Sequence, residues 1–251
     1  MLENIGLPLE PGPQSLDELA IFFTLLAFHH HHEVVLDREL LAELQKDLVI
    51  LLFAPDQNTM YPFGLENGMR VQASPDLAAT LEGHSRPGHF DGVVTVVARL
   101  FNLVTPDIAV FGEKDFQQLL MIRRMVDDLG YGIRIVAVPT VRETSGLAMS
   151  SRNNYLGADE RATAGALYAV LLEVADRIRK SPGQWLQAEQ DAKKRLEFFG
   201  FRVDYVAVRR AKDLGRPEPA DLDLRVLAAA YSSGTRLIDN VSAIRVGITG
   251  E

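Results

Sequence analysis

The residues best suited to chemistry begin with the stretch FGEKDFQQ, residues 111–118, which lies where a predicted strand ends and a predicted helix begins. In an open α/β sheet, ligands bind beyond the carboxyl ends of the strands, and a helix N-terminus offers free N–H groups to anions. Lys114 could therefore pair with a phosphate, while Asp115 could cap the helix or accept a hydrogen bond from a ribose hydroxyl. A solvated turn with Asp115 as the N-cap is the structural alternative.

A second polar stretch, GLAMSSRNNYL at residues 146–156, combines two serine hydroxyls with an arginine. A mobile loop of this kind can close over a triphosphate, with Arg152 as a forked donor to the phosphate oxygens. The alternative is a serine turn that precedes a helix expected from Ala158.

His29 and His32 belong to a run of four histidines at the end of the first predicted strand. At this spacing they share one face of a helical turn, from which they could donate to phosphate oxygens. A metal-binding tract or part of an engineered tag would produce the same run. Farther along, Arg86 and His89 lie in GHSRPGHF, where Arg86 could pair with a carboxylate or simply belong to a turn.

Alternating apolar runs and helical patterns predict a parallel α/β sheet in the first part of the chain. The predicted strands are 20–28, 48–53, 108–111 and 133–138, and the predicted helices are 34–45, 92–104 and 116–129. The strand, helix and strand between 108 and 138 form a βαβ unit, in which the GEKD turn follows the first strand.

The pattern changes after Val141 to a polar loop, which is followed by helices and further strands. We predict helices at 158–179 and 184–199 and strands at 203–208 and 224–230. The chain therefore divides into a domain of residues 1–141 and a domain of residues 142–251.

Composition limits the function further. The chain has 251 residues, 47% of them hydrophobic and 24% charged, and its net charge of -8 leaves no broad basic surface for nucleic acid. Without cysteine there can be no disulfide, thiolate zinc site or cysteine nucleophile. No apolar run approaches the length of a membrane span, and the first residues lack the pattern of a signal peptide. We expect a cytoplasmic protein with neither nucleic acid nor membrane as a partner.

The order of motifs resembles that of the pantoate–beta-alanine ligase (pantothenate synthetase) family from about Leu51 to Asn240. The matching stretches are LLFAP, MYP, SRPGHF, VTVVARLFNLV, GEKDFQQ, IRRMV, VPTVRE, GLAMSSRNNYL, DYVAV and TRLIDN. GEKDFQQ followed at this distance by GLAMSSRN is far more specific than a lone glycine-rich loop.

The resemblance implies a Rossmann-like domain of the nucleotidylyltransferase superfamily, a smaller α+β C-terminal domain that acts as a lid, and a homodimer. It also implies a reaction in two steps. ATP and pantoate form pantoyl adenylate and pyrophosphate, and the amine of beta-alanine then attacks the adenylate to give pantothenate and AMP. Positioning and charge stabilisation at the α-phosphate, helped by Mg²⁺, would provide most of the catalysis.

The family motifs also imply roles for particular residues. Residues matching ATP-binding positions are Gly112, Glu113, Lys114, Asp115, Val141, Met149, Ser150, Ser151, Arg152 and His29. Gln118 matches a pantoate-binding position, and Arg86 and His89 match a segment near the substrate pocket. Residues expected to act in catalysis are His32 as proton donor and Lys114, Ser150, Ser151 and Arg152 as phosphate stabilisers. No residue is expected to ligate a metal on its own.

The sequence departs from the family near its start. The family signature PTMGxLHxGH aligns with residues 23–32, but Leu25 and Leu26 replace its Met-Gly pair and His31 replaces a glycine. Its NPxQF loop has no counterpart between His32 and Leu51, where about 30 residues, the size of one βα module, are missing. Two alternatives follow: a catalytically impaired relative that binds nucleotide and serves as a binding or assembly module, and an enzyme that adenylates another acid. Gln118 weighs against the second.

Overall fold

The computed structural model describes residues 53, 55–181 and 183–244. The first part of this region carries three short helices, α2 (Gln57–Met60), α3 (Pro75–Ala78) and α4 (Glu82–Ser85), and then the long helix α5 (His89–Val104). The predicted helix at 92–104 is confirmed and begins three residues earlier. The predicted strands 20–28 and 48–53 and the helix 34–45 lie outside the described residues, apart from Phe53, which is in no strand.

The predicted βαβ unit is confirmed. Strand β1 (Ile108–Gly112) is followed by the short 3₁₀ turn η2 (Glu113–Asp115), helix α6 (Phe116–Asp128) and strand β2 (Arg134–Val138). The two strands pair in parallel, with Ile108 opposite Arg134. This connection places the η2 turn at the carboxyl end of β1, where a parallel sheet binds its ligands.

Helices α5 and α6 pack together because each has apolar residues at helical spacing. The buried faces belong to one core cluster that includes Phe90, Val94, Val97, Phe101, Leu119, Ile122 and Val126. Burying each such side chain contributes about 1.5–3 kcal/mol. This packing fixes the first turns of α5 and α6 relative to each other. It therefore also positions the residues that precede the two helices.

The second half of the chain contains the turn η3 (Ser151–Tyr155), three helices and three strands. The helices are α7 (Ala158–Ala164), α8 (Ala166–Lys180) and α9 (Trp185–Phe198). The single helix predicted over 158–179 is wrong, because it is interrupted at Gly165. At this position a Cβ atom would lie 2.2 Å from the carbonyl oxygen of Ser145, so the neighbouring backbone lies too close for any larger residue.

The strands β3 (Arg202–Arg210), β4 (Asp223–Ser232) and β5 (Thr235–Ile244) form an antiparallel sheet in the order β3-β4-β5. The predictions at 203–208 and 224–230 are confirmed, while β5 was not predicted. Its sequence signal is the two-residue turn Ser233-Gly234 after β4, in which both residues have positive φ, as a tight hairpin requires. With the helices α7 to α9, this antiparallel sheet forms an α+β unit that follows the parallel α/β unit in the chain.

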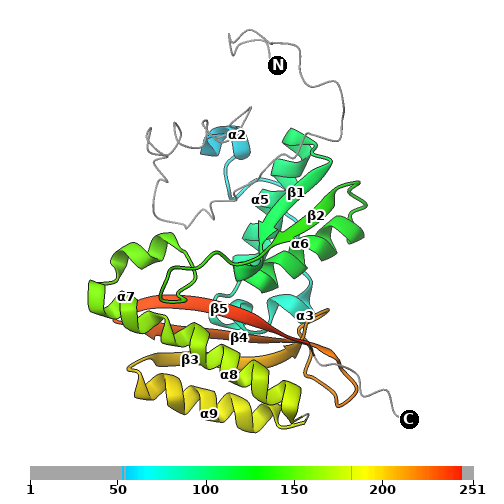
Figure 1. The fold of residues 1–251 in the computed structure, drawn as a ribbon. Helices are drawn as coiled ribbons and strands as arrows, with labels where there is room; N and C mark the ends of the chain where they lie inside the picture. The colour runs from blue at the N-terminus through cyan, green and yellow to red at the C-terminus, as the bar shows by residue number, and fades with distance from the viewer. Residues whose placement is uncertain (1–52, 54, 182, 245–251) are drawn as a thin grey trace, which may run out of the picture.

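Helices α8 and α9 cover one face of this sheet, and the α5–α6 layer lies beyond its other face (Figure 1). The buried residues accordingly form two clusters. One lies under α8 and α9, while Leu227 of β4 and Tyr205 of β3 pack with the α5–α6 cluster. The boundary at residue 141 stays a prediction, and the separation of the two clusters supports it.

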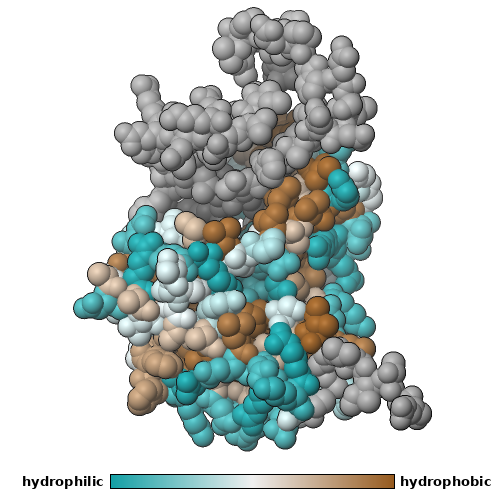
Figure 2. Space-filling view, in the orientation of Figure 1, coloured by the Kyte–Doolittle hydropathy of each residue, from teal (hydrophilic) through white to brown (hydrophobic). Residues whose placement is uncertain are grey.

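The surface in Figure 2 mixes polar residues with smaller apolar patches over the lower part of the molecule, and apolar residues gather over β1 and β2. Exposed apolar side chains of this region include Leu129 and Val138. Within the described ranges, every helix is too short or too polar to cross a membrane.

Candidate active site

A polar pocket lies where the first turns of α5 and α6 face strands β4 and β5. Its empty space, which includes the open mouth, is about 610 Å³. The charged and polar residues that line it are Glu82, Arg86, His89, Lys114, Asp115, Gln117, Gln118, Arg152, Asp239 and Asn240. A smaller pocket adjoins it and shares Lys114 and Arg152.

The η2 turn brings Lys114 and Asp115 to this pocket directly after β1. Asp115 occupies the N-cap position of α6, but its side chain makes no capping hydrogen bond. Of the two possibilities considered for Asp115, the N-cap position is thus confirmed without the capping hydrogen bond, and the residue lines the pocket. Lys114 lies on the walls of both pockets, as expected for a residue that binds a phosphate chain.

The C-terminal sheet holds the η2 turn through a chain of hydrogen bonds. Asn240 Nδ2 donates to the carbonyl oxygens of Glu113 at 2.9 Å and Lys114 at 2.8 Å. Arg225 donates from Nε to Asn240 Oδ1 at 2.6 Å and from Nη2 to Glu113 Oε2 at 2.7 Å. The Glu113 carboxylate is thus paired with a guanidinium and does not line the pocket.

Arg86 and His89 form a pair at the start of α5. Arg86 Nη1 lies 2.9 Å from His89 Nε2. A guanidinium can only donate, so Nε2 accepts and the proton of a neutral His89 is assigned to Nδ1. The predicted carboxylate partner of Arg86 is replaced by this histidine. Burial, and then the positive charge of Arg152, lower the pKa of Arg86, while the negative charges of Glu82 and Asp115 act in the opposite direction. An anionic ligand between Arg86 and Arg152 would reduce the repulsion between these two guanidinium groups.

Glu82 fixes the segment that precedes Arg86. Its carboxylate accepts two hydrogen bonds from Arg236, at 2.7 and 2.8 Å, and one from the Tyr205 hydroxyl at 2.8 Å. Burial, and then the neighbouring Glu82 charge, raise the pKa of Tyr205 well above its usual value. Tyr205 is therefore a neutral donor at ordinary pH, and the carboxyl group that accepts from it is paired with Arg236.

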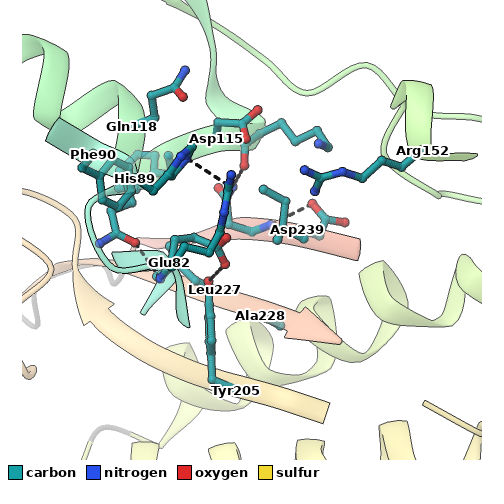
Figure 3. A pocket seen from close by; sticks show the side chains of 16 residues that line it. Glu82, His89, Phe90, Asp115, Gln118, Arg152, Tyr205, Leu227, Ala228 and Asp239 are labelled. Carbon is teal, nitrogen blue, oxygen red and sulfur yellow. Dashed lines mark hydrogen bonds between the residues drawn. The ribbon is translucent and has the colours of Figure 1, made fainter. Parts of the chain in front are cut away.

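The two glutamines of GEKDFQQ have different surroundings. The Gln117 side chain is 3% exposed, donates to the carbonyls of Leu77 and Thr80, and accepts from the Glu82 N–H at 3.1 Å. Gln118 also lines the pocket, beside His89 (Figure 3). Gln117 thus organises the chain before Arg86, whereas Gln118 is placed to contact a ligand.

Arg236 also bonds Asp204, which in turn accepts from Ser85 at 3.0 Å. Partial burial by itself would raise the pKa of Asp204, but the hydrogen bonds from Arg236 and Ser85 outweigh it and the pKa lies below its usual value. Asp204 of β3 and Arg236 of β5 therefore hold the two ends of α4, at Ser85 and Glu82.

The loop that carries Arg152 is anchored at both ends. Arg142 makes a two-pronged ion pair with Asp239, at 2.7 and 2.9 Å, and its guanidinium lies 3.5 Å above the Tyr168 ring. Asn153, which is 1% exposed, donates to Glu143 at 2.7 Å and to the carbonyl of Ala148 at 3.1 Å. The loop is therefore positioned by contacts with β5, α7 and α8.

Within this loop the predicted serine turn is confirmed, since Ser150 Oγ accepts from the Arg152 N–H at 3.3 Å. The turn also directs Arg152 into the pocket from the side opposite His89 and Gln118 (Figure 3). The structural and the functional interpretation of the stretch are thus compatible.

The structure brings a subset of the predicted site residues together. Those that line the two pockets are Arg86, His89, Lys114, Asp115, Gln118, Ser150 and Arg152. Those that line neither are Gly112, Glu113, Val141, Met149 and Ser151. Val141 and Met149 are 66% and 56% exposed, and the Val141 carbonyl accepts from the Met149 N–H at 2.9 Å. Their binding roles stay predictions. His29 and His32 lie outside the described residues.

Several residues of the site were not predicted. Asp239 and Asn240 are buried polar residues within a strand, and the match of TRLIDN to the family was the signal that pointed to them. Arg236 lies in the same TRLIDN motif and Tyr205 in DYVAV, whereas Glu82 lies in none of the matching stretches. The motifs do not reveal the partners of these three residues, because each partner comes from a distant element. Groups of three or more potential metal-ligating side chains are absent from the part of the chain that the structure describes.

Comparison with known proteins agrees with this architecture. The pantothenate synthetase structure from Thermus thermophilus matches with a TM-score of 0.77 and 44% identity, over 86% of this chain and 77% of that one. A pantoate–beta-alanine ligase from Francisella tularensis, complexed with beta-gamma ATP and beta-alanine, matches with a TM-score of 0.64 and 30% identity, over 84% and 70%. The fold is therefore of the nucleotidylyltransferase type, a Rossmann-like α/β domain with a smaller α+β domain.

Sequence comparison narrows this class to one family. The family model described as Pantoate-beta-alanine ligase matches residues 30–242, and the chain belongs to this family. Pantothenate synthetase from Thioalkalivibrio sulfidiphilus is 51% identical over 193 residues, 77% of this chain and 67% of that protein. The enzyme from Pseudomonas entomophila is 52% identical over 191 residues, 76% and 66%. The match thus spans about two-thirds of the length of these relatives.

Proposed function

We propose that the protein condenses pantoate with beta-alanine to form pantothenate, using ATP and passing through pantoyl adenylate. The observation that carries the proposal is that Lys114 and Arg152 enter one pocket from separate elements and meet Gln118 and Arg86 there. Membership of the pantoate–beta-alanine ligase family and the Francisella tularensis complex with beta-gamma ATP and beta-alanine give the chemistry of the ligands.

In the first step a pantoate carboxylate oxygen attacks the α-phosphorus of ATP, and pyrophosphate leaves. Negative charge accumulates on the phosphate oxygens as the new bond forms. Lys114 and Arg152, with the hydroxyls of Ser150 and Ser151, are the proposed groups that stabilise it. Because Asn240 holds the backbone at Lys114 and Ser150 holds the backbone at Arg152, we expect little reorganisation of these two segments during the reaction.

In the second step the beta-alanine amine attacks the acyl carbon of the adenylate, the bond to the phosphate oxygen breaks, and AMP leaves. Gln118 is proposed to hold pantoate, with Arg86 and His89 at the same wall of the pocket. The contact between Arg86 Nη1 and His89 Nε2 orients the imidazole ring. His32 remains the proposed proton donor, although it lies outside the described residues.

The rest of the proposed ATP site comprises Gly112, Glu113, Asp115, Val141, Met149 and His29. Mg²⁺ fits this site as an ion carried by the ATP phosphates, because one or two carboxylates suffice to hold it there and Asp115 lines the pocket beside Lys114. Bound in that way, Mg²⁺ would neutralise part of the phosphate charge.

We also propose that the protein is a cytoplasmic homodimer and that residues 142–251 act as a lid over residues 1–141.

The test is pantoate-dependent release of pyrophosphate from Mg-ATP, with ATP binding measured by calorimetry on the same sample. We expect release with pantoate, none without an acid, and pantothenate as a product detected by mass spectrometry after beta-alanine is added. Acetate and lactate serve as control acids and should not support release. Binding of ATP without release for any acid would contradict the ligase function.

A further inference from the structure

We propose that Asn240 and Arg225 of the C-terminal sheet are positioning residues that hold the η2 turn in the shape in which Lys114 binds the phosphates of ATP. The inference rests on the proposed function and adds to it two residues that act through Lys114. They are separated from the turn by more than 100 positions in the sequence, and they reach it only through the fold.

The contacts of Asn240 determine the backbone on both sides of Lys114. The peptide carbonyls of Glu113 and Lys114 both accept from Asn240 Nδ2, which uses both hydrogens of that amide. Each peptide group is planar, so fixing two successive carbonyls fixes both planes that meet at the Lys114 Cα. The direction in which the Lys114 side chain leaves the turn is therefore set by Asn240.

Arg225 determines the orientation of Asn240. Its Nε–H needs an acceptor, and the Oδ1 of Asn240 at 2.6 Å supplies it, which leaves Nδ2 facing the two carbonyls. The same guanidinium bonds the Glu113 carboxylate and lies 4.2 Å above the Phe116 ring, so it contacts the residues before and after the Lys114–Asp115 pair. Asn240 and Arg225 are 4% and 8% exposed, and water therefore competes little for these bonds.

The direct test is Asn240→Asp, which keeps the size of the side chain and the oxygen that accepts from Arg225. It replaces the donating amide by an oxygen that faces two carbonyl oxygens. We expect the KM for ATP to rise at least about tenfold and kcat to fall, while the KM for pantoate stays within about twofold. The unfolding temperature should fall, because two buried carbonyls lose their donor, but the protein should still fold.

The matched control is Asn102→Asp, the same chemical change at an exposed position of α5 about 20 Å along the helix from His89. It should leave both KM values unchanged. Arg225→Lys provides a second variant, because an ammonium retains the charge but cannot bond Asn240 and Glu113 as a planar fork does. It should raise the KM for ATP selectively, as Asn240→Asp does.

The inference is wrong if the folded variants keep the KM for ATP within about twofold, or if the KM values for ATP and pantoate rise together, since general loosening would affect both substrates. Failure of both variants to fold would also overturn it, because the two residues would then serve the whole fold. If the unsubstituted protein releases no pyrophosphate, the proposed function fails separately. In that case the calorimetric Kd for ATP decides. A rise of about tenfold or more in Asn240→Asp, relative to the unsubstituted protein, supports the inference. An equal Kd in the two proteins, or no ATP binding by the unsubstituted protein, contradicts it.

Discussion

Lys114 is one of two cations that the adjoining pockets share, and its position follows from its place between the end of β1 and the start of α6. Arg152 is the second shared cation, but it belongs to a loop that is anchored separately. A phosphate chain that occupies both pockets would therefore contact cations from two elements. Removal of either cation alone should weaken ATP binding by a measurable amount.

Lys114→Ala should weaken ATP binding by about 10- to 100-fold, because a charge-assisted hydrogen bond contributes about 1.5–3 kcal/mol. Calorimetric titration with Mg-ATP measures the effect. Lys193→Ala, which removes an exposed lysine from α9, is the matched control and should bind ATP normally. An unchanged Kd for Lys114→Ala would remove the GEKD turn from the nucleotide site.

Asp204 should make stability depend on pH. Its pKa is lowered in the folded protein, so its ionised form stabilises the fold at pH values above the pKa of an unfolded aspartate, about 3.9, and this contribution is lost as the pH falls through the folded-state pKa. Asp204→Asn should therefore lower the free energy of unfolding by about 1 kcal/mol at pH 7, after allowance for partial exposure, and by less near pH 3.

Urea unfolding at several pH values between 7 and 3 measures this difference. Asp127→Asn, at an exposed position of α6, is the control and should match the unsubstituted protein at pH 7. A difference between Asp204→Asn and the unsubstituted protein that stays constant down to pH 3 would contradict the assigned ion pair.

At the scale of secondary-structure elements, the break between α7 and α8 lies where the backbone of Gly165 contacts the carbonyl of Ser145. Both halves have the apolar spacing of one continuous helix, and Gly165 itself has helical dihedral angles, φ -59° and ψ -22°. The Ser145 carbonyl lies against Gly165, at the base of the 146–153 loop. The break therefore brings the loop that carries Arg152 onto the helices that support it.

Gly165→Ala should destabilise the protein by about 1–3 kcal/mol, because the new methyl group would collide with the Ser145 carbonyl. Gly92→Ala offers the opposite case, since a Cβ at this exposed position in α5 would meet no atom within 4 Å. It should stabilise the helix by up to about 1 kcal/mol. Urea midpoints of the two variants should thus move in opposite directions, and equal shifts would contradict the close contact.

At the scale of the whole molecule, the two apolar clusters are joined at the sheet. Leu227 of β4 is 4% exposed and packs with the α5–α6 cluster, while its neighbours in the strand, Val226 and Ala228, belong to the other cluster. The Glu82–Arg236 pair and the Asn240 contacts cross the same boundary. We therefore expect the described region to unfold as one cooperative unit.

Ile122→Ala tests this coupling. Ile122 of α6 is fully buried, so the substitution should cost about 2–5 kcal/mol. The only tryptophan of the chain, Trp185, packs against the other cluster and reports on its unfolding. Trp185 fluorescence and far-UV circular dichroism should shift together to lower urea concentration. Leu103→Ala, at a half-exposed position of α5, should shift neither signal by a comparable amount. A Trp185 transition that does not move would show that the clusters unfold independently.

The local sequence determined much of the architecture. Apolar spacing was enough to predict α5, α6 and α9 and the strands β1 to β4, because each of these elements has its own period and its own breakers. The motifs GEKDFQQ and GLAMSSRN were enough to single out Lys114, Gln118 and Arg152, which the structure brings to one pocket, while their roles stay predictions. The family resemblance followed from the same residues and is confirmed.

Only the tertiary structure decided how these residues are held. Glu82 pairs with Arg236 across 154 positions, and Asn240 bonds Lys114 across 126. No period or motif in the local sequence encodes such pairs, because each partner is brought into range by the packing of the whole chain. The two glutamines of GEKDFQQ are a further example. Gln117 organises the fold and Gln118 lines the pocket, and this difference depends on how the helix packs against its neighbours. A sequence pattern indicates which chemistry is available, and the fold determines which atoms meet.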